Sequence, residues 1–235
     1  MKKFLIVILI ITAAIVAAWK VYYPKSDYPS GEWRYKITME IETPEGIKFG
    51  SAVREISARV QPRIKPETHP VSYEVKGEAI AVDLGKHGVV FALVNWTDVE
   101  MVQAAFPFHN PNSKEGLNYY KNLPIGKKET LTKWIPQFVM FENLNDPMTV
   151  KLVRGGRFNK DTQKTDQVND FETIFGTGVN LKNVTVEITD EPVTWKIEKI
   201  LPWMYKIKGG YINGEFTSRN APLGLHGGNF KKGER

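Results

Sequence analysis

The stretch WRYKITMEIETPEGIKFGSAVREISARV, residues 33–60, decides the fold class of this chain. Its first part alternates, with apolar side chains at the odd positions from Trp33 to Ile41 and polar ones between them, as in a half-buried strand. The sequence Thr43-Pro44-Glu45-Gly46 then predicts a tight turn, because proline fixes φ and glycine accepts positive φ. We therefore expect a β-hairpin that begins an antiparallel sheet.

The second half of this stretch changes its apolar phase. Apolar residues occupy odd positions at Ile47, Phe49 and Val53, and even positions from Ile56 onward. An extra residue in a strand shifts its side chains in this way, so the pattern predicts a β-bulge near Arg54 and Glu55.

The rest of the chain adds strands and short helices to this hairpin. Alternating or fully apolar runs predict strands at 71–84, 89–94, 148–152, 184–188 and 193–197, and the run VVFALV at 89–94 is typical of a central strand. Capping and stop signals predict short helices after Thr97, after Ser113, at 127–135 and between Asn169 and Gly176. We expect a mainly β (α+β) fold, an antiparallel sheet or sandwich with short inserted helices, over residues 33–216. A glycine-rich basic tail, 217–235, follows it.

Composition limits the function classes. The 235 residues are 42% hydrophobic and 25% charged, which suits one globular domain. The net charge of +6 is spread along segments in which Lys and Glu alternate, and this argues against nucleic-acid binding. Cysteine is absent, which excludes disulfides, thiolate metal sites, a cysteine nucleophile and a lipidated cysteine.

The N-terminal run MKKFLIVILIITAAIVAAWKVYY, residues 1–23, has two interpretations. As a transmembrane signal anchor, its part from Phe4 to Tyr23 spans about 30 Å at 1.5 Å per residue, with Trp19, Tyr22 and Tyr23 at the headgroup level. As a signal peptide it would be cut before Trp19. We favour the anchor, because an aromatic belt serves a retained span. Either interpretation exports the bulk of the chain, and residues 24–32 then form a polar linker.

Motifs for known chemistry are missing from the sequence. The four histidines, His69, His87, His109 and His226, form no metal-binding pair, and no nucleophile motif or phosphate-binding loop occurs. Glu40 and Glu42 share one face of the first predicted strand and could form a catalytic pair, but Lys36 on the same face indicates ordinary solvent-facing charge. The sequence therefore predicts no catalytic residue, no metal site and no cofactor.

Aromatic residues offer a binding interpretation instead. They could line an apolar groove, although core packing is the alternative for most of them. The segment Trp134 to Phe141 is the exception, because Pro136 interrupts a dense apolar run there. We assign candidate binding residues to Trp134, Ile135, Phe138 and Phe141.

Three blocks carry a resemblance to a known family. ITMEIETPEGIKFGSAVREI (37–56), GEAIAVDLGKHGVVFALV (77–94) and ITDEPVTWKIEKILPW (188–203) look like a family of bacterial proteins with a short N-terminal anchor and no established activity. The resemblance implies a bacterial envelope setting. It implies no ligand, cofactor or catalytic residue.

Three functions remain open at this point. The first is a binding or scaffolding protein of the cell envelope, anchored in the inner membrane with its bulk in the periplasm and with an envelope protein as a partner. The second is a periplasmic hydrolase using carboxylates, for which the candidates are Glu40, Glu42, Asp190 and Glu191. The third is a protein that binds lipid or another small apolar ligand.

Overall fold

The computed structural model describes residues 28–61, 70–95, 97–159, 162–207, 210–215 and 221–233, together with Thr12. In this part of the chain no helix is both long enough and apolar enough to cross a bilayer. The anchor or signal peptide predicted for residues 1–23 lies outside the described residues, apart from Thr12, and stays a prediction.

The predicted hairpin forms and contains the two longest described strands. β1 (Ser30–Thr43) and β2 (Gly46–Val60) pair antiparallel, from Ser30 opposite Arg59 to Thr43 opposite Gly46. β1 buries its odd positions from Trp33 to Thr43, as the alternation predicts. The positive φ of 114° at Gly46 closes the turn.

The bulge predicted near Arg54 and Glu55 is wrong. β2 is described throughout, and its register to β1 and to β3 is continuous there. Cross-strand neighbours share a face, so the even positions of β2, including Arg54 and Ile56, lie on the inner face with the odd positions of β1. Ile47 and Phe49 point outward, with 37% and 63% of their surface exposed. The apparent phase change arises because apolar residues occupy outer positions at Ile47 and Phe49, while the charged Arg54 occupies a core position.

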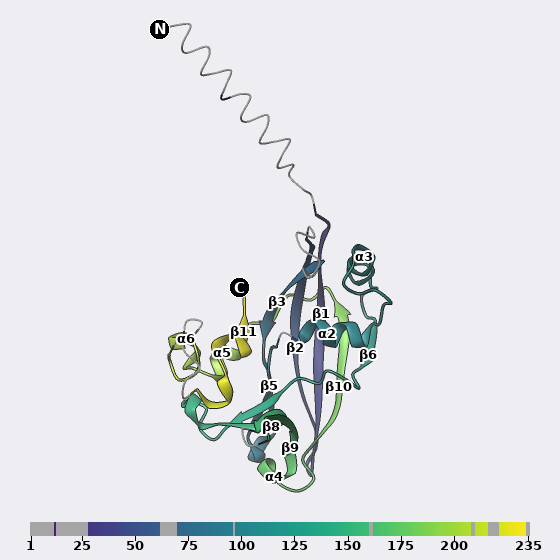
Figure 1. Ribbon diagram of the computed structural model, residues 1–235. Helices are drawn as coiled ribbons and strands as arrows, with labels where there is room; N and C mark the ends of the chain where they lie inside the picture. The colour runs from purple at the N-terminus through teal and green to yellow at the C-terminus, as the bar shows by residue number, and fades with distance from the viewer. Residues whose placement is uncertain are drawn as a thin grey trace, which may run out of the picture.

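The strands form two antiparallel sheets (Figure 1). The first sheet has the order β11-β3-β2-β1-β10-β6, with β3 (Val71–Glu78), β6 (Lys128–Thr130), β10 (Asn180–Thr189) and β11 (Lys231–Lys232). The second has the order β4-β5-β7-β8-β9, with β4 (Ile80–Asp83), β5 (Val89–Ala92), β7 (Phe138–Phe141), β8 (Val150–Asn159) and β9 (Lys164–Asn169). The mainly β, antiparallel class predicted from the sequence is confirmed.

The chain passes directly from one sheet to the other. It leaves the first sheet at Glu78 and enters the second at Ile80, with only Ala79 between them. β5 lies inside the second sheet, as predicted, and is buried on both faces. Val90 and Ala92 point into a first hydrophobic core shared with β1 and β2, while Phe91 points into a second core. This double burial explains the continuous apolar run at 89–94.

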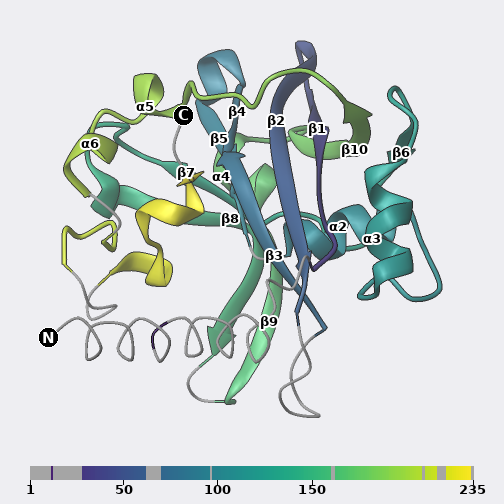
Figure 2. The same ribbon diagram turned by 90° about the horizontal axis from the view of Figure 1, so that it is seen from above.

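Short helices cover the sheets. They are α2 (Asp98–Ala105), α3 (Lys114–Lys121), α4 (Phe171–Phe175), α5 (Ile197–Ile200) and α6 (Met204–Ile207), with 3₁₀ turns η1 (Gly85–His87), η2 (Pro147–Thr149), η3 (Pro222–Gly224) and η4 (Gly227–Asn229). α2 and α3 lie on one side of the molecule and α5 and α6 on the other (Figure 2). The helix predicted at 127–135 is wrong, because this segment forms β6 and then an irregular stretch in which Trp134 has a φ of 58°.

The strand predicted at 193–197 is also wrong, because these residues form an irregular segment and the start of α5. Residues 190–196, which we call the strap, run from β10 across β1 and β2 to α5 (Figure 2). Thr194 and Val53 exchange hydrogen bonds, from Thr194 N to Val53 O at 3.1 Å and from Val53 N to the Thr194 hydroxyl at 3.2 Å. Trp195 is half-buried beneath the ammonium of Lys231, which lies 5.4 Å from its ring centroid.

Residues 221–233 of the glycine-rich tail pack onto the domain. They form short 3₁₀ turns and the short strand β11, and Phe230 is fully buried in the second core beside Phe141 and Trp203. β11 then pairs with the end of β3. This segment is therefore part of the packed domain.

A buried polar network centred on Arg54 joins the first sheet to α2, and Arg54 Nη2 also donates to the carbonyl oxygens of Ala92 and Leu93, at the end of β5, at 3.4 Å. Arg54 is 0% exposed, and its Nη1 donates to Oδ2 of Asp98 at 2.7 Å. Its Nε donates to the carbonyl of Glu78 at 3.0 Å. The Tyr35 hydroxyl donates to the same Asp98 oxygen at 2.7 Å. Burial lowers the pKa of Arg54, but Asp98 and Tyr35 outweigh this effect, so the pKa is raised and the guanidinium stays charged.

Candidate functional site

The four candidate binding residues do not share one surface. Trp134 is 48% exposed and Ile135 is half-buried against the first core. Phe138 lies in the first core and Phe141 in the second, because β7 alternates between the two faces of the second sheet. Only Trp134 among them presents a large apolar surface to solvent.

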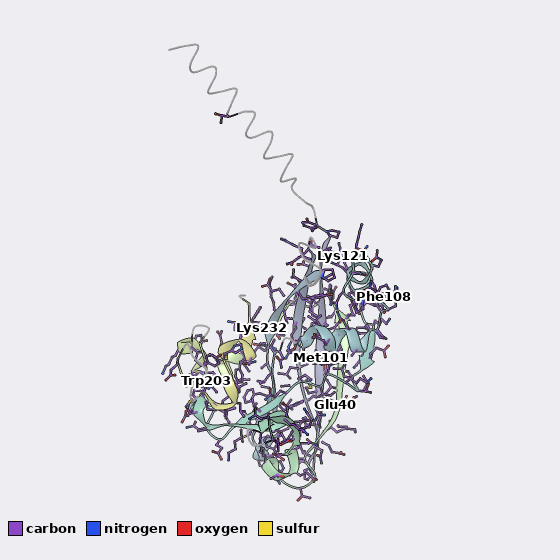
Figure 3. The ribbon with its side chains drawn as sticks, viewed as in Figure 1. Glu40, Met101, Phe108, Lys121, Trp203 and Lys232 are labelled. Carbon is purple, nitrogen blue, oxygen red and sulfur yellow. The ribbon has the colours of Figure 1, made fainter. Side chains whose placement is uncertain are left out.

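Most other aromatic side chains pack against one another. Trp203 contacts Phe141 and Phe230 in the second core, where Figure 3 labels it. Trp33 stacks on Tyr120 with their ring centroids 5.5 Å apart. Trp96 lies outside the described residues. The aromatic residues therefore serve mainly as core.

The four candidate carboxylates are also dispersed. Glu40 and Glu42 lie on the outer face of β1, opposite Phe49 and Ile47 (Glu40 is labelled in Figure 3). Glu191 lies in the strap and forms an ion pair with Lys36 at 2.9 Å. This spread offers no paired acid and base.

Histidine 87 has a structural role. Its Nδ1 is 2.7 Å from the carbonyl oxygen of Phe175, and its Nε2 is 3.0 Å from Oε2 of Glu45. Lys86 and then His87 bind the Glu45 carboxylate and lower its pKa to about 2. These contacts tie η1 to the hairpin turn and to the end of α4. No group of three metal-binding side chains occurs among the described residues.

A large cavity lies elsewhere, at the end of the first sheet where β1 begins. It is an open cleft of about 850 Å³, which we call the groove. Ribbon and stick views place this end beside α3, whose last residue Lys121 is labelled in Figure 3. The walls of the groove come from the starts of β1 and β3, the end of β2 and the end of α3. The lining residues are Ser30, Gly31, Glu32, Ser57, Ala58, Arg59, Gln61, Ser72, Tyr73, Glu74 and Lys121.

Strand register arranges the polar residues of the groove in two rows. Ser57 of β2 lies between Glu32 of β1 and Glu74 of β3. In the next row, Arg59 lies between Ser30 and Ser72. Cross-strand neighbours point to the same face of a sheet. The two rows therefore form one polar surface.

The next row toward the strap shows a contrasting arrangement. There Glu55 accepts from Arg34 Nε at 2.9 Å and lies 3.5 Å from Lys76 Nζ, so its charge is neutralised by both neighbours. In the groove, by contrast, the carboxylates of Glu32 and Glu74 form no ion pair with any described residue. Their hydrogen-bonding capacity faces solvent.

The sheet that forms the floor of the groove is held in place from its opposite, inner face. Gly31 lies against α3, where an added Cβ would be 3.2 Å from Leu117 Cδ2 and from Lys121 Cδ. The Tyr73 hydroxyl donates to the carbonyl of Pro111 at 3.2 Å and lies 3.1 Å from Oδ1 of Asn112. Burial raises the pKa of Tyr73 to about 12, so the hydroxyl stays protonated at neutral pH. The floor of the groove is thus preorganised.

A smaller cavity of about 220 Å³ adjoins the groove and shares Glu32 and Lys121 with it. Trp33 and Tyr120 also line this cavity. Trp33 Nε1 and the Tyr120 hydroxyl are buried without a hydrogen-bond partner among the described residues. Burial raises the pKa of Tyr120, so its hydroxyl stays protonated and can donate. The indole N–H of Trp33 is a donor at any pH.

The chemistry of the groove suits binding. Its lining contains hydroxyls, carboxylates, cations and an amide but neither histidine nor cysteine. Glu32 and Glu74 are exposed, whereas a general-acid carboxyl is normally desolvated. No linear pattern predicts this site, because its residues come from separate elements and become neighbours only through strand register and the packing of α3.

Comparison with protein-family models, with curated proteins and with solved structures finds no match for this chain. The groove must therefore be interpreted from its own geometry.

Proposed function

We propose that this chain is a binding protein of the bacterial cell envelope, anchored in the inner membrane, whose binding site is the groove. The groove carries the proposal, because it combines a volume of about 850 Å³ with many unpaired hydrogen-bonding groups. The apolar run at 1–23 and the resemblance to anchored envelope proteins support the location.

The position of the groove fits this setting. β1 starts at Ser30, so residues 24–29 separate the apolar run from the first sheet. Six extended residues reach at most about 20 Å. An anchored chain would hold the groove close to the periplasmic surface of the membrane, where it meets membrane-bound or cell-wall ligands.

The two alternatives have less support. A hydrolase acting through Glu40, Glu42, Asp190 and Glu191 would need these carboxylates to converge, and Glu191 is paired with Lys36 instead. A protein for small apolar ligands would need an apolar cavity, whereas Phe138 and Phe141 fill the cores themselves. Trp134 remains a possible contact for an envelope protein partner, separate from the groove.

Three measurements test the proposal. A reporter that is active only outside the cytoplasm, fused to the C-terminus, should be active, and extraction with alkaline carbonate should leave the chain in the membrane. A photo-crosslinking amino acid placed at Ser57 should then capture envelope material in living cells. The matched control is Ser51, which lies on the same strand and face but outside the groove.

An inactive reporter would overturn the envelope location. Equal capture at Ser57 and Ser51, or capture at neither, would overturn the groove as the binding site. Capture at Trp134 alone would instead favour a scaffolding role through that residue.

A further inference from the structure

The charge balance of the groove limits its ligand. Two carboxylates, from Glu32 and Glu74, and two cations, from Arg59 and Lys121, line the groove. None of these four side chains forms an ion pair within the described residues. An anion would approach two carboxylates, and a cation would approach an arginine and a lysine. A strongly charged ligand of either sign therefore meets repulsion as well as attraction.

The polar groups are instead matched to a ligand that donates and accepts hydrogen bonds at many points. Carboxylates only accept and Arg and Lys only donate, while serine hydroxyls do both. A sugar hydroxyl also does both, so it can donate to Glu32 or Glu74 and accept from Arg59 or Lys121. Hydrogen bonds to charged groups are the stronger ones, which allows a neutral ligand to bind without an ion pair.

The dimensions agree with this chemistry. Strands lie about 4.8 Å apart, so each row from β1 to β3 is about 10 Å wide. Successive rows lie two residues apart, which is about 7 Å along a strand. Such a surface, within a cleft of about 850 Å³, accommodates a short chain of pyranose rings and is larger than a single small ion needs.

We propose that the groove binds a neutral, hydroxyl-rich oligosaccharide, with Glu32 and Glu74 accepting from its hydroxyls and Arg59 donating to its oxygens. This inference rests on the proposed function, since it uses the same groove.

The test uses the purified full-length chain in a mild detergent. Neutral trisaccharides, one of N-acetylglucosamine and one of glucose, are titrated by isothermal calorimetry, with phosphoethanolamine and spermidine as the charged comparison ligands. At least one trisaccharide should bind. Its Kd should change less than about twofold between about 0.05 M and about 0.5 M NaCl, because an uncharged ligand is insensitive to screening.

Variants locate the binding. Ser57→Trp places an indole between Glu32 and Glu74 and should weaken binding at least about tenfold, since it fills the row; each of Glu32→Gln and Glu74→Gln should weaken it by about tenfold. Ser51→Trp is the matched control and should leave the Kd unchanged. Thermal unfolding of each variant within a few degrees of the parent shows that folding is intact.

Three results would overturn the inference: no trisaccharide binds, binding is unaffected by Ser57→Trp in a folded protein, or only the charged ligands bind and do so in a salt-sensitive way. If Ser57 crosslinks envelope material in cells while the trisaccharides fail, the proposed function stands and the ligand class is wrong. If the crosslinks and the reporter fail as well, the proposed function falls with it.

Discussion

Removal of the Asp98 carboxylate should be among the most damaging single changes in the domain. Asp98 accepts from Arg54 Nη1, from the Tyr35 hydroxyl and from the backbone of Asn95. Asp98→Ala would leave the Arg54 guanidinium, which is 0% exposed, without a counter-ion. Breaking a buried ion pair from one side costs about 3–5 kcal/mol, against a total stability of roughly 5–15 kcal/mol for a typical domain. Tyr35→Phe removes one hydrogen bond and should cost only about 1 kcal/mol.

The assay is equilibrium urea unfolding of the full-length chain in mild detergent, followed by tryptophan fluorescence. The double variant Asp98→Ala with Arg54→Met removes both charges, so it should be more stable than the sum of the two single effects by about 2 kcal/mol or more. A loss below about 1 kcal/mol for Asp98→Ala, or strict additivity in the double variant, would refute the view that the buried pair between β2 and α2 stabilises the domain.

Three further changes test other contacts. Gly77→Ala should destabilise the domain by roughly 1–3 kcal/mol in the same assay, because Gly77 has a φ of 139° and its Cβ would lie 2.7 Å from Arg54 Cγ; an unchanged midpoint would contradict this. Glu45→Gln should lower the free energy of unfolding at pH 7 but not near pH 2. Lys86 and the neighbouring imidazole lower the Glu45 pKa to about 2, so its contribution is present above its ordinary pKa and is lost as pH falls through about 2. Glu78→Gln should speed proteolysis within residues 197–233, since the Glu78 carboxylate accepts from the first amides of α5, and an unchanged cleavage rate would argue against that role.

Much of the fold could be predicted because it depends on local patterns. The alternation from Trp33 to Ile41 and the turn at Gly46 are sufficient for the first hairpin. Helix α3 follows from Ser113, whose hydroxyl accepts from the amide of Gly116. The continuous apolar run at 89–94 indicates a strand buried on both faces.

The errors have a different origin. Arg54 occupies a core position because Asp98, 44 residues later, neutralises it, and no local pattern shows this. The helix α2 forms as predicted, but its predicted cap does not. The Thr97 side chain makes no capping hydrogen bond, and the Asp98 carboxylate accepts from the Asn95 amide instead. The groove has no linear signature, because strand register between separate segments creates it. Tertiary pairing, which propensity and periodicity do not encode, decides such features.

The position of β1 has a mechanical consequence. β1 is bonded to β2 along residues 30–43 and to β10 along residues 34–42, antiparallel on both sides. Tension that enters the domain through the residues before Ser30 pulls β1 along its own axis. The ladders on both sides are then loaded in shear, so that many hydrogen bonds must fail together instead of opening one at a time. A domain held by this end would resist extraction by force far better than one held by an edge strand such as β9.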